Sequence, residues 1–381
     1  MSFVVELGRL PLASLADLAA KAGTGDVEAA LRRKRRSLED FAALVSPAAS
    51  EPVFLEEMAR QAHELTLKHF GRTIRLFAPL YLSNVCVNGC RYCGFARDNT
   101  IQRMTLTLEQ VSNEARYLRE EGFRHILLVA GEHPRVVDVD YLRDCVARLH
   151  PDWPSISMEI GPMETSGYEP IVQAGAEGLV IYQETYNRDV YAAMHPAGPK
   201  RDFDHRLETP ERAYAAGFKR IGVGALLGLA LWRTEAISMA GHVGHLLRHC
   251  WKAQVTVSVP RLRPAAGAFD PPEKIGEREM VQLVCALRLT FPEIGIVLST
   301  RERATLRDGL IPLGVTMISA GSHTEPGGYT GQGMPVIASE GEHAAEQFAV
   351  ADNRTPSEMA TVLTAMGYEP VWKDWENVLN E

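Results

Sequence analysis

Residues 76–95 read LFAPLYLSNVCVNGCRYCGF, a short apolar run followed by three closely spaced cysteines. The apolar run has the length and composition of a buried β-strand. Cys86, Cys90 and Cys93 follow it with the spacing C-x3-C-x2-C, which lets three thiolates turn toward one metal centre. A cubane iron–sulfur cluster has four irons and normally takes four cysteines. Three thiolates would therefore leave one iron open for a substrate or cofactor.

A zinc site is the competing interpretation of the cysteine run, because Cys-x2-Cys is a common half-site for zinc. A structural zinc site usually has a fourth ligand nearby, often from a second cysteine pair. The other cysteines, Cys145, Cys250 and Cys285, stand singly in the sequence. The spacing favours an open iron–sulfur cluster, and a zinc-stabilised binding protein is the alternative from another functional class.

The length and composition limit the fold, the compartment and the partners that the protein can have. The chain has 381 residues, of which 46% are hydrophobic, enough for one barrel domain with terminal extensions. Six cysteines without paired spacing predict a reducing compartment, and the first thirty residues contain no apolar core of a signal peptide, so we expect a cytoplasmic protein. No apolar run is long enough to span a bilayer, and a net charge of −8 argues against general nucleic-acid binding. We expect neither a membrane nor a nucleic acid as a partner.

Beyond about residue 74, short apolar runs alternate with amphipathic segments, a pattern that favours a parallel α/β architecture. We expect strands at Leu76–Leu82, His125–Val129, Ser155–Ile160, Gly178–Tyr182, Arg220–Val223, Val255–Val259, Gly295–Ser299 and Gly314–Ser319. We expect helices between them at Glu109–Arg119, Asp140–Leu149, Tyr168–Gln173, Thr209–Ala216, Glu235–Arg248, Glu279–Thr290 and Glu302–Asp308. Eight such strands predict a (β/α)8 barrel with its functional groups at the carboxyl ends of the strands. The expected divisions are an N-terminal helical extension (1–70), the barrel (71–322) and a C-terminal extension (323–381).

Carboxylates follow three of the expected strands, where a charge needs a structural or chemical reason. The second strand leads into Gly131-Glu132-His133, the third ends near Glu159, and the fourth leads into Gln183-Glu184. A carboxylate at a glycine turn can accept hydrogen bonds from a desolvated ammonium group. The alternatives are a solvent-facing turn for Glu132 and barrel-internal salt bridges for Glu159 and Glu184.

Arginines and serines follow the last strands. Arg301 comes after the seventh strand, where a guanidinium can grip a carboxylate through two parallel hydrogen bonds. Ser319 and Ser322 end the eighth strand and are candidates to assist it. Further candidates are Arg261 and Arg263 after the sixth strand. The alternative for Arg301 is a structural ion pair with Glu302 or another barrel acid.

Two further patterns partly resemble known binding motifs but do not match them. Gly222 and Gly224 lie in the fifth strand, but Leu227 stands where a dinucleotide-binding fingerprint needs its third glycine. His242, His245 and His249 share one helical face. The helix lacks the glutamate of a zincin motif, so we expect an ordinary helix surface there.

The cysteine spacing, with the aromatic Tyr92 directly before the third cysteine, resembles that of the radical S-adenosylmethionine (SAM) superfamily. Within it, the chain resembles the 2-iminoacetate synthases, the tyrosine lyases of thiamine biosynthesis. The resemblance spans Phe77 to Trp375, about four-fifths of the chain. The stretches that carry it are FAPLYLSN (77–84), GEH (131–133), VIYQETY (180–186), LSTRE (298–302), PGGY (326–329) and PVWKDW (370–375).

The resemblance implies one [4Fe-4S] cluster on Cys86, Cys90 and Cys93, with SAM chelating the open iron. It implies SAM-binding roles for Tyr92, Glu132, Glu159, Glu184, Arg201, Gly222 and Gly224. Arg206 competes with Arg201 as the partner of the SAM carboxylate. It implies that Arg301 binds the substrate carboxylate, with Ser319, Ser322, Arg261 and Arg263 nearby. The last strands would belong to the biotin and thiamin synthesis-associated region, about 258–363.

The resemblance also implies the reaction. SAM is cleaved to methionine and a 5′-deoxyadenosyl radical, which takes a hydrogen from the amino group of L-tyrosine. The Cα–Cβ bond then breaks to give 2-iminoacetate (dehydroglycine) and 4-cresol. Implied partners are a thiazole synthase that receives the imine and a reduced flavodoxin or ferredoxin-type electron donor. A related tryptophan lyase is the alternative. A hydrogenase-maturation lyase is disfavoured because no cysteine follows Cys285.

Overall fold

The computed structural model describes residues 2–267, 269–331 and 346–372. The helices before the barrel and on its first half are α1 (Phe3–Leu7), α2 (Leu12–Lys21), α3 (Thr24–Arg32), α4 (Leu38–Leu44), α5 (Pro52–Phe70), α6 (Leu108–Glu120), α7 (Val139–Leu149), α8 (Thr165–Gln173) and α9 (Arg188–Met194). The later ones are α10 (Phe203–Leu207), α11 (Thr209–Ala216), α12 (Trp232–His249), α13 (Glu277–Thr290), α14 (Ala304–Leu310) and α15 (Pro356–Ala365). Short 3-10 turns are η1 (Ala48–Ser50), η2 (Pro199–Arg201) and η3 (Ile311–Leu313).

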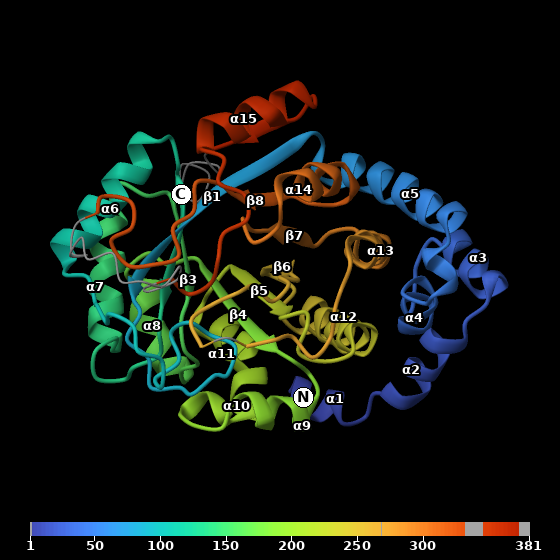
Figure 1. Cartoon of the computed structure of the whole chain (residues 1–381), viewed down its shortest axis with the longest axis horizontal. Coiled ribbons are helices and arrows are strands. Elements are labelled where there is room, and N and C mark those ends of the chain that lie inside the picture. Colours follow the sequence, from blue (N-terminus) through green and yellow to red (C-terminus); the bar gives the residue numbers. More distant parts are fainter. Residues whose placement is uncertain (1, 268, 332–345, 373–381) are drawn as a thin grey trace.

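The strands form a closed parallel barrel surrounded by helices (Figure 1). They are β1 (Thr73–Ser83), β2 (His125–Ala130), β3 (Ser155–Glu159), β4 (Gly178–Glu184), β5 (Arg220–Ala225), β6 (Gln254–Ser258), β7 (Gly295–Leu298), β8 (Met317–Ser319) and β9 (Glu369–Val371). The order runs from β2 to β8, then β1, and pairing of β1 with β2 closes the ring. The predicted (β/α)8 barrel is therefore confirmed, with all eight expected strands in place.

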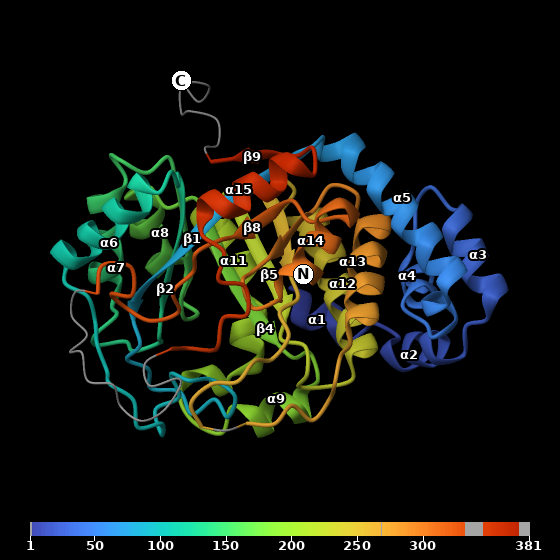
Figure 2. The same cartoon turned by 45° about the horizontal axis from the view of Figure 1, so that its top comes forward.

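The short strand β9 was not predicted. It pairs in parallel with the start of β1, from Thr73 opposite Glu369 to Arg75 opposite Val371. Three residues are too few to give a period-two pattern in sequence. The strand forms because β1 is long: its first residues precede the part that pairs with β2, and they pair with β9 instead. Figure 2 shows β9 beside α15, at the outside of the barrel.

The N-terminal helices form an added layer on one side of the barrel, outside α12 and α13 (Figures 1 and 2). The helix α5 packs against α13, and it starts with Pro52 at its first position, where the missing N–H costs nothing. The guanidinium of Arg36 donates to the carbonyls of Ala30, Leu31 and Leu289, at distances of 2.8–3.0 Å. One arginine thus satisfies helix-end carbonyls of both α3 and α13, joining the layer to the barrel.

The C-terminal segment is tied back to the barrel. The buried side chain of Arg307 pairs with Asp352 and also donates to the carbonyl of Ser319 at the end of β8. The described part of the glycine-rich loop is anchored too, because Tyr329 and Thr330 donate their backbone N–H groups to the buried carboxylate of Glu114 on α6. The glycine-rich composition of residues 327–333 by itself predicts a flexible lid or a partly disordered loop. Residues 332 and 333 of that loop lie outside the described residues.

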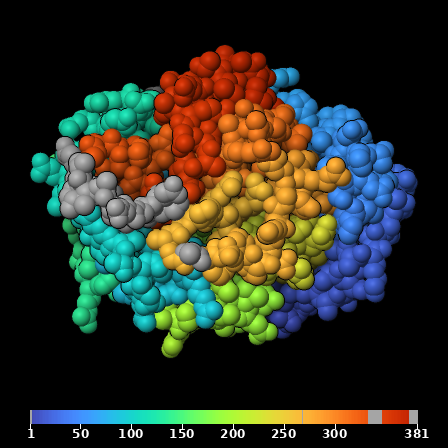
Figure 3. All heavy atoms as spheres, viewed as in Figure 1, coloured from blue at the N-terminus to red at the C-terminus, as the bar shows by residue number. Residues whose placement is uncertain are grey.

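The carboxyl ends of the strands open onto one face of the molecule. Figure 3 shows this face, where the segment between β6 and α13 (gold to orange) lies across the middle, beside the cyan segment that follows β1. Asn99 in the segment after β1 donates to the carbonyl of Ala266, at 3.0 Å, which joins the two segments. Among the described residues, no helix combines the length and apolar character that crossing a bilayer requires.

Candidate active site

The cysteine loop leaves the end of β1 and is held by backbone hydrogen bonds to several other segments. The N–H of Val87 donates to the carbonyl of Glu132 after β2, at 2.9 Å. The N–H of Gly89 donates to Ala197 and that of Arg91 to Met194, at 3.0 and 3.1 Å, in the connection after β4. Further along, Gly94 donates to the carbonyl of Gln347, at 3.1 Å, in the C-terminal segment. The loop is thus fixed before any cofactor binds.

Glycines allow this loop to lie close to its neighbours. A Cβ atom on Gly131 would lie 2.5 Å from the carbonyl oxygen of Val85 and 3.1 Å from the Cβ of Cys86. A Cβ on Gly94 would lie 2.4 Å from the carbonyl oxygen of Glu346. Both neighbours are backbone atoms that cannot rotate away, so a side chain at either position would push the cysteine loop out of place.

The three cysteines are free thiols in one loop, with Cys90 buried and Cys86 and Cys93 half-buried. Burial raises the pKa of Cys90 to about 12 and that of Cys93 to about 11. A bound metal centre would reverse this by stabilising the thiolates. The donor set of three soft thiolates fits an iron–sulfur cluster with one open iron.

The spacing of the sulfur atoms also bears on the zinc alternative. Two thiolates on one tetrahedral zinc lie about 4 Å apart, given Zn–S bonds of about 2.3 Å. Within the described ranges, the cysteine sulfurs do not form a set that lies within 4.8 Å of one another. The three thiols are therefore not already arranged as ligands of a single zinc ion.

Tyr92 is oriented by a histidine that the sequence did not single out. Its hydroxyl lies 2.7 Å from Nε2 of His195, whose Nδ1 lies 2.8 Å from the carbonyl oxygen of Tyr191. A carbonyl can only accept, so Nδ1 carries the hydrogen and Nε2 accepts from Tyr92. Burial lowers the pKa of His195 to about 3, which keeps the ring neutral and this tautomer fixed. The aromatic ring beside Cys93 is therefore held in one orientation.

Glu132 lies beside the cysteine loop. Asn88 donates its side-chain N–H to Oε2 of Glu132, at 2.7 Å, and its Nδ2 lies 3.7 Å from the sulfur of Cys86. The Asn88 oxygen accepts from the backbone N–H of Lys200, at 2.9 Å. Asn88 thus links the first cysteine, the Gly-Glu-His turn and the connection after β4. The prediction did not include it, although it lies between two of the cysteines.

Glu184 ends β4 in an unusual backbone conformation. Its φ is 71°, and it is the one non-glycine residue with positive φ in the described part of the chain. Such strain persists where surrounding contacts enforce it and often marks functional sites. Its Oε1 accepts from Nζ of Lys200, at 2.6 Å, and lies 3.6 Å from the guanidinium of Arg206. Burial alone would raise the pKa of Glu184, but the charges of Lys200 and Arg206 outweigh it and hold the pKa below its ordinary value.

The two candidate arginines after β4 lie in different environments. Arg206 is buried, and its Nε donates to the carbonyl of Tyr182, at 2.7 Å. Arg201 is exposed on η2. Lys200, which the prediction left out, points inward to Glu184, with its Nζ 5.7 Å from the centre of the Tyr92 ring. The sequence does not show which of Lys200, Arg201 and Arg206 faces inward, because that depends on the turns of η2 and α10.

Gly222 and Gly224 on β5 lie close to neighbouring strands. A Cβ on Gly222 would lie 2.9 Å from the side chain of Val180. A Cβ on Gly224 would lie 2.0 Å from the carbonyl of Ser258 and 2.7 Å from the ring of Tyr182. Close packing accounts for both glycines, and their expected role in SAM binding stays a prediction.

The barrel mouth also contains a cavity of about 60 Å³, lined by residues of β1 to β4 as well as by residues of β6 to β8 and the segments that follow them. Its lining combines apolar groups with Glu159, Arg301, Ser319 and Ser322, which were predicted, and Gln347 and Phe348, which were not. The guanidinium of Arg301 lies 3.3 Å from the centre of the Phe348 ring, as a cation–π contact. Gln347 accepts from the hydroxyl of Tyr81, at 2.8 Å. Their segment, far away in sequence, forms part of the cavity wall.

Arg301 has no acidic partner in the part of the chain that the structure describes. The neighbouring Glu302, which was its expected alternative partner, pairs instead with Arg261 and Arg263. The carboxylate of Glu302 accepts a hydrogen bond of 2.9 Å from Nε of Arg261 and one of 3.1 Å from the guanidinium of Arg263. These two arginines are thus engaged in a structural cluster, whereas Arg301 faces the cavity.

The two serines differ in their contacts. Ser319 accepts from the backbone N–H of Thr300, at 3.2 Å. The hydroxyl of Ser322 is buried and has no hydrogen-bond partner among the described residues. A buried polar group without a partner costs free energy unless a ligand or water satisfies it. Ser322 is therefore ready to bind a ligand in this cavity.

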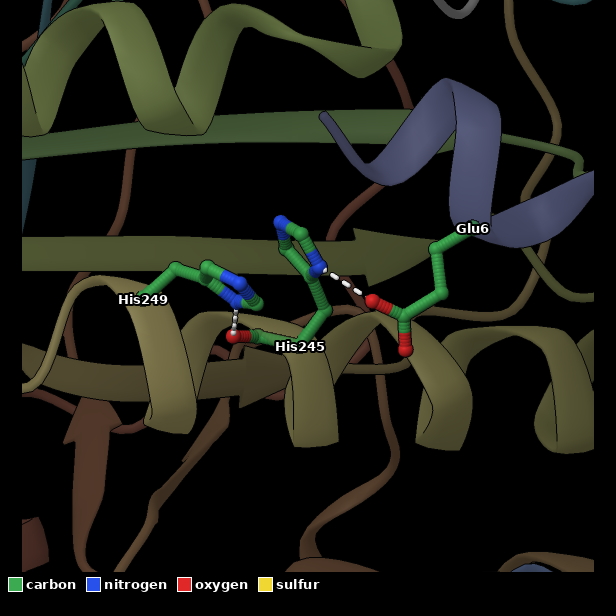
Figure 4. Close-up of side chains that lie close together, drawn as sticks. All are labelled: Glu6, His245 and His249. Carbon is green, nitrogen blue, oxygen red and sulfur yellow. Dashed lines mark hydrogen bonds and ion pairs between the residues drawn. The ribbon is translucent and has the colours of Figure 1, made fainter. Parts of the chain in front are cut away.

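The expectation of an ordinary helix surface around the α12 histidines was wrong for two of them. His242 and His245 are buried, because α1 covers this part of α12. Figure 4 shows Glu6 from α1 meeting His245, with 2.6 Å between Oε2 and Nδ1. The other ring nitrogen of His245 lies 3.1 Å from Glu211. The rings of His245 and His249 stack at 4.1 Å, and ligand atoms of Glu6, His245 and His249 lie within 4.8 Å of one another. The contacts of His245 with Glu6 and Glu211 bind α1 to the barrel.

Two family models match the chain. Residues 80–231 match the radical SAM superfamily, and residues 258–369 match the biotin and thiamin synthesis associated domain. The chain is 44% identical to 2-iminoacetate synthase from Escherichia coli (strain K12) over 355 residues, covering 93% of this chain and 91% of that protein. It belongs to the 2-iminoacetate synthase family. The predicted resemblance is confirmed.

Solved structures agree with this membership. A crystal structure of HydG, a maturase of the [FeFe]-hydrogenase, matches with a TM-score of 0.87 and 33% identity over 95% of this chain and 79% of that one. The crystal structure of methylornithine synthase matches with a TM-score of 0.72 and 21% identity, which supports the fold alone. Radical SAM enzymes of the 2-iminoacetate synthase family use a [4Fe-4S] cluster with three cysteine ligands together with SAM, so these are the cofactors of this chain.

Proposed function

We propose that this chain is a radical SAM lyase that cleaves the Cα–Cβ bond of L-tyrosine to 2-iminoacetate and 4-cresol, for the thiazole ring of thiamine. Its similarity to the Escherichia coli 2-iminoacetate synthase along most of both chains supports this reaction. The observation that carries an amino-acid substrate is Arg301. Its guanidinium faces a cavity beside the cysteine loop and has no acidic partner among the described residues.

On the cofactor side, Cys86, Cys90 and Cys93 would hold the cluster. When bound, the cluster and SAM supply the 5′-deoxyadenosyl radical that starts the reaction. Glu132, fixed by Asn88 beside the loop, would accept from the amino group of SAM. The SAM-binding set further includes Tyr92, Glu184 and the glycines of β5.

We favour Arg206 over Arg201 as the partner of the SAM carboxylate. Arg206 is buried on the side of Glu184 and Tyr92, whereas Arg201 is exposed. Lys200 supplies a second positive charge at the same place. A carboxylate binds best where preformed donors already face it.

On the substrate side, Arg301 would grip the tyrosine carboxylate through two parallel hydrogen bonds, and Ser322 would donate a third. The α-amino group would then face the cofactor half of the mouth. Phe348 and Gln347 close the cavity wall and would keep water away from reactive species. Ser319 also lines the cavity, whereas Arg261 and Arg263 would act only indirectly, through their ion pairs with Glu302.

The test is anaerobic reconstitution with iron and sulfide, followed by incubation with SAM, a strong reductant and L-tyrosine. We expect equal amounts of 5′-deoxyadenosine and 4-cresol, with the imine trapped or recovered as glyoxylate after hydrolysis. L-Tryptophan in place of tyrosine tests the related lyase. Tryptophan consumption without 4-cresol release from tyrosine would overturn the substrate assignment.

The partners follow from the chemistry. The imine hydrolyses readily in water, so direct transfer to a thiazole synthase would protect it. The reaction needs a low-potential electron, which a reduced flavodoxin or ferredoxin-type protein would deliver. We place the reaction in the cytoplasm, where such donors and reduced thiols are available.

A further inference from the structure

The cavity beside Arg301 contains one carboxylate, that of Glu159, the last residue of β3. The structure shows no hydrogen bond or ion pair to this carboxylate from any residue that it describes. The other carboxylates of the barrel mouth are engaged: Glu132 by Asn88, Glu184 by Lys200, and Glu302 by Arg261 and Arg263. Glu159 is half-buried, and its carboxylate lines the cavity without a protein partner among the described residues, so it is available to a ligand that enters there.

The barrel topology places Glu159 across the cavity from Arg301. In the closed ring, three strands lie between β3 and β7 in either direction, so the two strands lie opposite each other. Opposite strands of an eight-stranded barrel are roughly 14 Å apart. Arg301 follows β7 and Glu159 ends β3, so a ligand between them has one end at each wall.

The polar groups of the cavity match the groups of tyrosine. Arg301 and Ser322 are donors that suit a carboxylate. The hydroxyl of Tyr81 already donates to Gln347, and Ser319 accepts from Thr300. The Glu159 carboxylate is an acceptor at the far wall. Between the two ends, Phe77, Leu127 and Val297 form an apolar wall that suits an aromatic ring.

Resting on the proposed function, we propose that Glu159 accepts a hydrogen bond from the phenolic hydroxyl of the substrate and thereby selects tyrosine over phenylalanine. This replaces the SAM-binding role that the resemblance implies for Glu159, because the residue faces the substrate cavity with Arg301. A site built around a substrate hydroxyl rejects an analogue without it strongly, since the buried acceptor is then left unpaired.

The electrostatics of the site agree with this role. Burial raises the pKa of Glu159 to about 7, against the opposing effect of the Arg301 charge. The ionised carboxylate is thus poorly stabilised in the empty cavity. A phenolic O–H would give it a charge-assisted hydrogen bond, while phenylalanine would place an apolar C–H against it.

The experiment measures the binding of L-tyrosine and L-phenylalanine to reconstituted, SAM-loaded enzyme, with Glu159→Leu and Glu159→Gln beside the wild type. We expect Glu159→Leu to lower the ratio of tyrosine affinity to phenylalanine affinity about 100-fold, because a hydrogen bond to a charged group is removed. Glu159→Gln keeps a neutral acceptor and should lose less. Iron content and SAM affinity should match the wild type in both variants.

Glu132→Gln is the matched control on the cofactor side. It should weaken SAM binding and leave the ratio of tyrosine to phenylalanine affinity unchanged. If Glu159→Leu instead lost affinity for tyrosine and phenylalanine equally, Glu159 would be assigned to the α-amino group, and the proposal would be overturned. Loss of SAM affinity with an intact ratio, or no change at all, would also overturn it.

The proposed function is checked separately by the wild type. If wild-type enzyme releases 4-cresol from tyrosine but the variants keep full selectivity, only the role of Glu159 fails. If the wild type cleaves SAM and releases no 4-cresol from tyrosine, the proposed reaction fails, and the role of Glu159 fails with it.

Discussion

The two halves of the barrel mouth are built differently. In the half formed by β1 to β5, the charged side chains are bonded to one another: Glu132 to Asn88 and Glu184 to Lys200 and Arg206. In the half formed by β6 to β8, Arg301 and Ser322 face a cavity without polar partners among the described residues. Glu159, which ends β3 within the first half, is an exception that lines the same cavity.

This difference separates a cofactor site from a substrate site. The ion pairs and hydrogen bonds of the first half hold the cysteine loop, Glu132 and Glu184 in place whatever the ligand, which is preorganisation. Unsatisfied groups in the second half are matched only when a ligand of the right chemistry arrives. The family models divide the chain in a similar way, with the radical SAM model on residues 80–231 and the biotin and thiamin synthesis associated domain on 258–369.

The largest expected effect lies in the cofactor half. Cys90→Ser should abolish the cluster, because a hydroxyl is a poor iron ligand in a site built for three thiolates. Iron content, the brown absorbance and 5′-deoxyadenosine formation should all fall to background. Cys285→Ala, in the buried face of α13, is the control and should keep all three. A colourless wild type with stoichiometric zinc would instead support the zinc-stabilised alternative and remove the distinction between the halves.

The substrate half should respond differently. Arg301→Ala should raise the apparent KM for tyrosine about 100-fold or more, because two charge-assisted hydrogen bonds are lost. SAM cleavage without substrate should be unchanged, as judged by 5′-deoxyadenosine formation. Arg303→Ala is the control, since that exposed arginine pairs with Glu277. Unchanged tyrosine affinity in Arg301→Ala would show that the free guanidinium is not a substrate contact.

The sequence predicted the barrel well because its strands and helices each have strong local patterns. All eight barrel strands were found, and errors were confined to their ends, as with β8, which starts at Met317 rather than Gly314. The short β9 was missed because it depends on pairing with β1. The cysteine loop was found because its three ligands are local in sequence.

The rest of the site depends on contacts between distant segments. Gln347 and Phe348 reach the cavity from the C-terminal segment, and no pattern in their neighbourhood marks them. Lys200 and Arg201 are adjacent, and only the turn of η2 decides that Lys200 faces Glu184. Glu159 was found as an acid at a strand end, but its place in the cavity required the closed ring of strands.

A smaller effect separates the neighbouring cations of the cofactor half. Arg206→Gln should raise the apparent KM for SAM by about 30-fold, because one charge-assisted contact is lost at a buried place. Arg201→Gln should change it less than about twofold, since the side chain is exposed. Steady-state rates of 5′-deoxyadenosine formation against SAM concentration measure both. The reverse order would return the carboxylate contact to Arg201.

The smallest effect concerns stability and pH in the substrate half. The pKa of Glu159 is about 7 in the folded chain, against 4.5 for an ordinary glutamate, so between these values the folded state holds more protons than the unfolded state. The folded state therefore loses stability as the pH rises from about 4.5 to 7, by at most about 3 kcal/mol. Glu159→Gln does not titrate and should escape this loss.

The measurement is the difference in Tm between Glu159→Gln and the wild type, for reconstituted protein under anaerobic conditions without tyrosine. We expect the difference to move in favour of the variant by a few degrees between pH 5 and pH 8. Glu235 has its pKa raised to about 7 by burial as well, but it is present in both proteins, so its contribution cancels. A constant difference across this range would mean that Glu159 already has a partner in the ligand-free enzyme. The contrast between a satisfied cofactor half and an unsatisfied substrate half would then rest on Arg301 and Ser322 alone.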